Sequence, residues 1–158
     1  MTPHPRIPVA IALGSNIGDR LSHLNFAIAR LGDFLSELEV SHFRETDPVG
    51  VEPQGQFLNG AAIGNTSLAA VDLLDQLLAI ERERGRVRPH VGAPRTLDLD
   101  LILYGGQILK TPGLQVPHPR FRERLFVLEP LAELAGEWQD PATGHTVREL
   151  LEAARARA

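Results

Sequence analysis

Two aspartates, Asp98 and Asp100, have the clearest chemical potential in this 158-residue sequence. They lie in segment 96–104, where apolar and polar residues alternate as in a β-strand. Residues two apart on a strand share a face, which would place the two α-carbons about 6.5 to 7 Å apart. Carboxylates this close repel each other unless a cation lies between them, and Mg²⁺ binds one or two carboxylates together with substrate phosphates. We therefore interpret Asp98 and Asp100 as candidate magnesium ligands, for a pair of ions that would clamp a polyphosphate.

An isolated Asp-x-Asp pair is also typical of a half-buried strand whose polar face meets solvent. The basic residues around this pair favour the metal site, because arginine's planar fork pairs with phosphate oxygens. Transfer of a phosphoryl or pyrophosphoryl group depends mainly on charge neutralisation and alignment, which carboxylates ringed by such cations would provide. The basic residues concerned are Arg86, Arg88, Arg95, His118 and Arg124. Together these residues predict a magnesium-dependent enzyme that moves a phosphate-type group from ATP.

Composition narrows the class of protein further. The chain has no cysteine, which excludes disulfides, thiolate catalysis and cysteine zinc sites and suits a reducing cytoplasm. Its net charge of -4 argues against a nucleic-acid binder. The apolar run 7–13 is far shorter than the roughly 20 residues that span a bilayer, and no cleavage site follows it. We expect a soluble, cytoplasmic monomer with one domain over residues 1–158, and neither nucleic acid nor membrane as partner.

The hydrophobic pattern predicts the elements that must position these residues. Strands are expected at 9–13, 40–43, 57–63 and 96–104, and helices at about 20–35, 69–84, 124–135 and 147–157. The last helix has a capping box, with Thr146 followed by Glu149 three residues later. Gly105 and Gly106 suit a two-residue hairpin turn into an extended segment 107–110. This order predicts an α+β, ferredoxin-like (split βαβ) antiparallel sheet with an extra hairpin and helices on both sides.

Other nucleotide-binding motifs are absent. The sequence contains neither a Gly-x-x-x-x-Gly-Lys-Ser/Thr loop nor a Gly-x-Gly-x-x-Gly after a strand, so phosphate-loop ATPases and dinucleotide dehydrogenases are not supported.

Six short sequence motifs occur in an order that resembles the 6-hydroxymethyl-7,8-dihydropterin pyrophosphokinase family of the folate pathway, over nearly the whole chain. The motifs are Ala12-Leu-Gly-Ser-Asn-Ile-Gly-Asp19, Glu45-Thr-Asp-Pro-Val-Gly50, Phe57-Leu-Asn59, Gly85-Arg-Val-Arg88, Pro94-Arg-Thr-Leu-Asp-Leu-Asp100 and Val116-Pro-His-Pro-Arg120.

The resemblance implies a reaction and roles for the charged residues. The β,γ-pyrophosphate of ATP would pass to 6-hydroxymethyl-7,8-dihydropterin, giving AMP and the pterin diphosphate. Asp98 and Asp100 would hold two magnesium ions, and Arg86 and Arg95 would neutralise charge on the migrating group. The implied nucleotide contacts are Glu81, Arg88, Leu101, His118 and Arg124. The turn after Gly14 and the segments 47–56 and 85–94 would correspond to the family's mobile loops, which close to exclude water.

The resemblance also implies a pterin site. The pterin would stack between Phe57 and Phe126, while Asn59 and backbone groups around Thr46 and Val49 would read its polar edge. Taken singly, each phenylalanine also fits simple core packing, and Asn59 also fits a strand-edge amide.

Two other functions remain open from the residues. A small nucleotidyltransferase also uses paired aspartates on a ferredoxin-like sheet, but it would release pyrophosphate rather than AMP. A ferredoxin-like binding module for a small ligand or RNA would not consume ATP. The acidic charge and the lack of an aromatic run on the strands count against RNA.

Overall fold

The structure is a computed structural model that describes residues 6–47, 56–85 and 96–158. In chain order its elements are β1 (Ile7–Ser15), α1 (Arg20–Leu31), β2 (Ser36–Val40), β3 (Arg44–Thr46), β4 (Phe57–Thr66), α2 (Ala70–Glu83), β5 (Asp98–Tyr104), β6 (Leu109–Thr111), β7 (Leu114–Val116), α3 (Leu125–Ala135) and α4 (Val147–Arg157). A short 3₁₀ turn, Phe121–Glu123, precedes α3.

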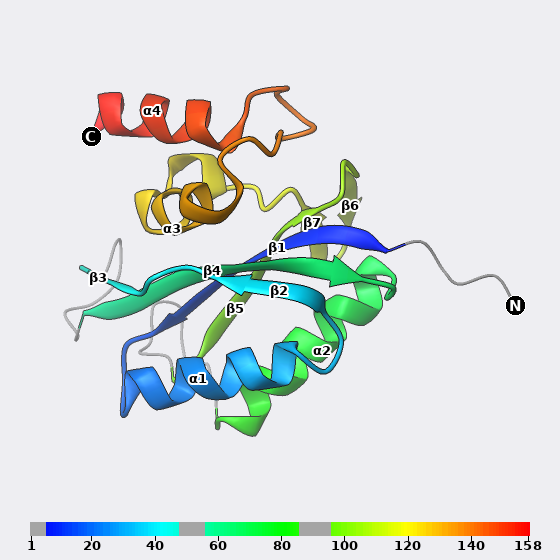
Figure 1. Ribbon diagram of the computed structural model, residues 1–158, viewed down its shortest axis with the longest axis vertical. Helices are drawn as coiled ribbons and strands as arrows, with labels where there is room; N and C mark the ends of the chain where they lie inside the picture. Colours follow the sequence, from blue (N-terminus) through cyan, green and yellow to red (C-terminus); the bar gives the residue numbers. More distant parts are fainter. Residues whose placement is uncertain (1–5, 48–55, 86–95) are drawn as a thin grey trace, which may run out of the picture.

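The main sheet has the order β2-β4-β1-β5, with β3 paired to β4, and its pairs are all antiparallel. Helices α1 and α2 cover one face of the sheet, and α3 and α4 lie on the other (Figure 1). Setting aside the short β3, the order strand, helix, strand, strand, helix, strand is that of the split βαβ plan. The predicted fold class is therefore confirmed.

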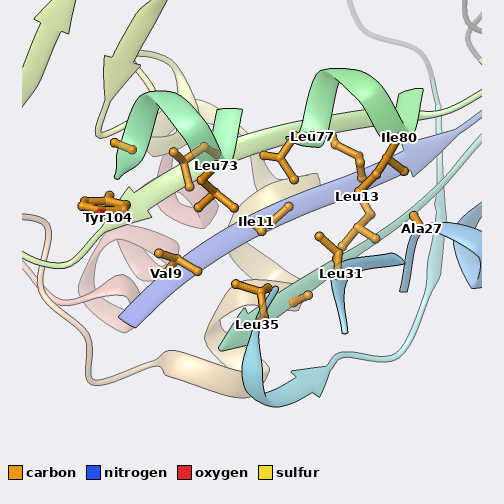
Figure 2. Packing of buried hydrophobic residues seen from close by; sticks show 14 of the residues in the cluster. Val9, Ile11, Leu13, Ala27, Leu31, Leu35, Leu73, Leu77, Ile80 and Tyr104 are labelled. Carbon is orange, nitrogen blue, oxygen red and sulfur yellow. The ribbon is translucent and has the colours of Figure 1, made fainter. Parts of the chain in front are cut away.

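Side chains on the central strand β1 alternate between two hydrophobic cores. Val9, Ile11 and Leu13 point into the first core, where they meet α1 and α2 (Figure 2). Ala10 and Ala12 point into the second core, which α3 and α4 close. Each fully buried leucine or isoleucine in these cores contributes about 1.5–3 kcal/mol relative to an exposed one. Burial on both faces fixes the orientation of β1, because a slip of one residue would exchange the two sets.

The prediction of a single strand at 40–43 is wrong. Two strands flank this segment instead, β2 ending at Val40 and β3 starting at Arg44. Between them the Ser41 hydroxyl accepts the backbone N–H of Ala61 at 2.9 Å, in the place of a ladder carbonyl. The Phe43 ring occupies the space above Gly60, where a Cβ would lie 2.6 Å from Phe43 Cδ1. These two contacts bend the chain and split the strand.

The predicted hairpin is also wrong in its position. Gly105 and Gly106 do form a turn, but strand β6 beyond it pairs with β7 and not with β5. The hairpin turns at Pro112 and Gly113, and Gly113 has φ +82°. Proline followed by a glycine of positive φ is the usual pair at the centre of a type II turn.

The end of one helix and the alternation of one strand differ from the sequence prediction. Helix α1 starts at Arg20 as expected but ends at Leu31, before Gly32, instead of near residue 35. Strict alternation in β5 stops at Leu101, because Leu101 and Leu103 pair with consecutive residues of β1 and leave Ile102 as an extra residue. The other two long strands and the other three helices lie close to their predicted ranges.

The last helix begins with the predicted cap. The Thr146 side chain accepts the Glu149 N–H at 3.1 Å, and Glu149 accepts the Thr146 N–H at 2.8 Å, so the predicted capping box is confirmed. Within the described ranges, every helix is too short or too polar to cross a bilayer.

Replacing Gly60 by alanine should destabilise the fold. The new methyl group would meet the Phe43 ring at 2.6–2.9 Å, and such overpacking costs about 1–3 kcal/mol. Urea unfolding would measure the change, with Gly106→Ala as control because nothing lies within 4 Å of a Cβ there. Equal stability of the Gly60→Ala and Gly106→Ala variants would contradict this account of the bend.

Candidate functional site

Asp98 and Asp100 lie on one face of the edge strand β5. Leu99, between them, and Leu101 pack into the first core, so the two aspartates point to the opposite face, on the side of α3 and α4. Both carboxylates are half-buried. The predicted side-by-side arrangement of the pair on a strand is thus present in the structure.

The register of the sheet aligns Asp98 with the predicted pterin residue Asn59. Gly14 on β1 pairs with Asn59 on one side and with Asp98 on the other. Directly opposed residues in antiparallel strands share a face, and strands are about 4.7–4.9 Å apart. Asn59 and Asp98 therefore flank Gly14 in a single row, with α-carbons roughly 10 Å apart.

Gly14 leaves room between these two residues. A Cβ at this position would lie 2.8 Å from Asn59 Oδ1 and 3.7 Å from Phe57 Cδ1. The side chains of Asn59 and Phe57 thus lean over the central strand. Asn59 is 6% exposed, and its amide nitrogen donates to Thr46 Oγ1. Strand pairing brings Thr46 directly opposite Phe57. Three of the predicted pterin residues are therefore adjacent.

A cleft of about 380 Å³ opens at the edge of β5. Among the predicted nucleotide contacts, Leu101 and His118 line it, together with the candidate metal ligand Asp100. Other lining residues come from α2 and from the β6–β7 hairpin: Leu74, Thr111, Pro112, Gly113, Leu114 and Gln115. Sequence reasoning did not select these hairpin residues as ligand contacts, because it placed the turn at Gly105. The Pro-Gly pair was the signal that would have found them.

His118 lines this cleft, and its pKa is lowered from the ordinary value. Its backbone N–H donates to the Ile102 carbonyl at 3.0 Å, and its Nδ1 accepts the Arg120 N–H at 3.2 Å. With Nδ1 as acceptor, the ring proton of neutral His118 is on Nε2. Burial lowers the pKa of His118 most, followed by the charge of Arg124, while Asp98 opposes these effects and Arg120 adds to them. Asp98 and Arg124 thus both lie within electrostatic reach of His118.

Arg124 and Phe126 lie at the start of α3. The Arg124 guanidinium carbon is 5.5 Å from the centroid of the Phe126 ring, a cation–π distance. Phe126 is half-buried and packs against the second core. It lies on the same side of the sheet as Phe57, since Leu58 packs into the first core and its neighbours point the other way.

Glu81 lies on the other side of β5. It is 5% exposed, and its Oε2 accepts the Leu99 N–H at 2.7 Å. Because β5 is the last strand of the sheet, this N–H faces outward from the ladder, and Glu81 satisfies it. Glu81 therefore fixes the backbone between the two aspartates.

Four predicted site residues lie outside the described residues: Val49, Arg86, Arg88 and Arg95. Within the described part of the chain, no group of three or more His, Cys, Asp or Glu side chains is arranged to hold a metal ion. Asp98 and Asp100 thus form a pair without a third acidic or histidine ligand from those residues.

Comparison with known proteins points to one family. The family model described as 7,8-dihydro-6-hydroxymethylpterin-pyrophosphokinase (HPPK) matches residues 10–136. A protein of Bacillus subtilis (strain 168) named 2-amino-4-hydroxy-6-hydroxymethyldihydropteridine pyrophosphokinase is 49% identical over 135 residues, which cover 84% of this chain and 81% of that protein. A protein of the same name from Pseudomonas aeruginosa is 45% identical over 148 residues, covering 92% and 90%.

Solved structures agree on the fold. The crystal structure of wild-type Plasmodium falciparum HPPK-DHPS with SDX-DHP matches with a TM-score of 0.78 at 12% identity and covers 99% of this chain. A second, of the A437G form with pteroate, matches with a TM-score of 0.77 at 12% identity and the same coverage of this chain. This chain spans 46% and 44% of those two chains, respectively.

The lowered pKa of His118 makes the stability of the protein depend on pH. Because the folded pKa is below the ordinary value of 6.5, the unfolded chain binds more protons as pH falls through that value. The stability that comes from keeping His118 unprotonated in the folded protein is therefore fully present above about pH 6.5 and is lost as the pH falls below it. The free energy of unfolding should therefore fall less between about pH 7 and about pH 5 in His118→Gln than in the wild type.

Urea titrations at the two pH values would measure this difference. The pKa of His23 is also lowered, chiefly by burial. Both histidines therefore contribute to the loss of unfolding free energy in the wild type, and the difference between the wild type and His118→Gln gives the part that is due to His118. An equal loss in both proteins would contradict the neutral assignment.

Proposed function

The chain belongs to the 7,8-dihydro-6-hydroxymethylpterin-pyrophosphokinase family, and on that premise we propose that Asp98 and Asp100 hold the metal ions used in its reaction. The reaction transfers pyrophosphate from ATP to 6-hydroxymethyl-7,8-dihydropterin, a step of folate biosynthesis that yields AMP and the pterin diphosphate. The single observation that best supports the site assignment is the row Asn59, Gly14, Asp98, with Asp100 next along β5.

The residues present fit magnesium. Mg²⁺ prefers hard oxygen ligands and keeps open positions for substrate phosphates and water, rather than a cage made only of protein side chains. The two half-buried carboxylates supply hard oxygens on one face, and the described residues add no third acidic or histidine ligand. We propose two magnesium ions at Asp98 and Asp100, which when bound would neutralise charge on the phosphate oxygens of ATP.

The nucleotide would occupy the cleft at the edge of β5. Leu101 and His118 line this cleft beside Asp100, so a nucleotide there would have its phosphates near the metal ligands. Neutral His118 presents Nε2–H as a donor for a phosphate oxygen, and Arg124 adds a positive charge close by. Glu81 and Arg88 remain proposed nucleotide contacts. Glu81 in addition fixes the β5 backbone through Leu99.

The pterin would lie over Gly14. Asn59 and Phe57 lean across this glycine, and Thr46 Oγ1 accepts a hydrogen bond from the Asn59 amide nitrogen, which leaves the amide oxygen directed toward Gly14 on β1. An amide beside an aromatic ring suits a flat heterocycle with polar edges. We propose that Phe126 forms the second wall and that backbone groups around Thr46 and Val49 complete the polar contacts.

These placements bring the two reacting groups together. The hydroxymethyl oxygen of the pterin would attack the β-phosphorus of ATP and lose its proton, and the bond from the β-phosphorus to the α-phosphate oxygen would break to release AMP. Such a transfer depends on alignment and on neutralising the phosphate charge. Arg86 and Arg95 are the proposed cations for the migrating group. The single 1–158 domain, the monomeric state and the cytoplasmic location stay predictions.

Product analysis tests this proposal. The protein would be mixed with Mg²⁺, ATP and 6-hydroxymethyl-7,8-dihydropterin, and the products separated by chromatography. AMP and the pterin diphosphate in equal amounts are expected. Release of inorganic pyrophosphate without AMP would indicate a nucleotidyltransferase instead.

Removing either carboxylate should abolish turnover without unfolding the protein. Asp98→Asn and Asp100→Asn keep the size of the side chain but remove the charge that holds the metal, so kcat/KM should fall by at least about 10²-fold. Initial rates of AMP formation would measure the loss, and Asp75→Asn, an exposed residue of α2, is the matched control. Near wild-type turnover in Asp98→Asn or Asp100→Asn would remove the basis for the proposed metal site.

Gly14→Ala should weaken pterin binding more than ATP binding. The added methyl group would lie 2.8 Å from Asn59 Oδ1, and pushing this amide aside should raise KM for the pterin by about tenfold. The test compares KM for the pterin and KM for ATP between Gly14→Ala and the wild type. Urea unfolding at the same concentration in both proteins would show that the fold is intact. A rise confined to KM for ATP would show that the pterin is placed incorrectly.

A further inference from the structure

Strand β3 carries Thr46 but is weakly supported within the sheet. It has three residues, and among the strands of the described ranges it pairs with β4 alone. The carboxylate of Glu133 on α3 contacts the chain at the start of β3 in two places. Glu133 Oε2 accepts the His42 backbone N–H at 2.9 Å, and Oε1 accepts Arg44 Nη2 at 2.9 Å. Glu133 thus ties the start of β3 to helix α3.

The same side of α3 carries the proposed second wall of the pterin site. Phe126 and Glu133 are seven residues apart on α3, or about two helical turns, so they lie on one stripe of the helix. The contact at Glu133 therefore sets the spacing between β3, with Thr46, and the helix that presents Phe126. A change in this spacing would alter the width of the gap in which a flat ring stacks.

Glu133 also controls where the Arg44 guanidinium lies. Arg44 pairs directly with Asn59, so the two side chains share a face of the sheet with Cβ atoms about 4.5–5.5 Å apart. While Glu133 binds the guanidinium, Arg44 is directed toward α3. Without that partner, a long cationic side chain would be free beside the amide proposed to read the pterin.

Glu133 is suited to remain charged in this role. Burial acts to raise the pKa of Glu133, but the hydrogen bonds from the His42 N–H, from Arg44 and from the His42 ring, with the charge of His42, together outweigh it and hold the pKa below its usual value. His42 Nδ1 makes a further contact at 2.9 Å, although this side chain is 89% exposed. The His42 ring therefore contributes least, because exposed pairs contribute little, whereas the Arg44 side chain is 37% exposed.

We infer that Glu133 is a positioning residue for the pterin half of the site: it fixes β3 against α3 and holds Arg44 away from Asn59. It touches neither substrate, and its role is distinct from that of Asp98 and Asp100. The inference rests on the proposed function, because it assumes that Thr46, Asn59 and Phe126 bind the pterin.

Kinetics of Glu133→Ala, with Glu133→Gln and Glu152→Ala beside it, test the inference. Glu133→Ala should raise KM for the pterin about tenfold while KM for ATP stays within about twofold, because only the pterin half loses its spacing. Glu133→Gln should give a smaller rise, since its amide oxygen still accepts the His42 N–H. Glu152, an exposed glutamate on α4, is the control for loss of charge alone.

A second substitution separates the two parts of the role. Adding Arg44→Met to Glu133→Ala should lower KM for the pterin again, because the released cation beside Asn59 is then absent. If Glu133→Ala does not fold, Glu133→Gln and its combination with Arg44→Met give the same comparison.

The outcomes separate this inference from the proposed function. No AMP from the wild-type chain would overturn both. AMP from the wild type, with an unchanged KM for the pterin in Glu133→Ala or an equal rise in both KM values, would overturn the role of Glu133 and leave the function standing.

Discussion

The position of β1 between β4 and β5 is the constraint on which the rest of the structure depends. Its side chains are buried on both faces, with Ile11 in one core and Ala12 in the other, so a slip of one residue against either neighbour would exchange the side chains that fill the two cores. That fixed register places Asn59 and Asp98 on either side of Gly14. The same packing that stabilises the fold therefore sets the spacing of the two proposed substrate sites.

The two faces of the sheet differ in the size of the side chains that cover β1. On one face, α1 and α2 pack large aliphatic side chains against β1 and hold the sheet rigid (Figure 2). The other face has alanines and glycine at its centre, which leaves depth for polar side chains near the end of β1. Single carboxylates then secure the edges, Glu81 at the backbone of β5 and Glu133 at the start of β3. A site on rigid strands, with short supporting contacts at its rim, suits a reaction that depends on alignment.

The sequence predicted the elements whose pattern is set by burial and missed those set by individual polar contacts. Alternation and helical spacing located β5 and α2, and with them the Asp98 and Asp100 pair. The bend at Ser41 was missed because a side-chain hydroxyl replaces a ladder carbonyl there, which no periodicity reveals. The hairpin at Pro112 was missed because Gly105 offered a competing turn signal, and the cleft residues on that hairpin were lost with it.

We propose that the two carboxylates on β5 bind metal ions, which in turn hold the phosphates of ATP beside the pterin. A crystal structure with Mg²⁺, an unreactive ATP analogue and the pterin tests it most directly. We expect metal ions about 2.0–2.1 Å from carboxylate oxygens of Asp98 and Asp100, with the pterin ring against Asn59. Metal bound elsewhere, with both carboxylates directed away from the phosphates, would contradict the account.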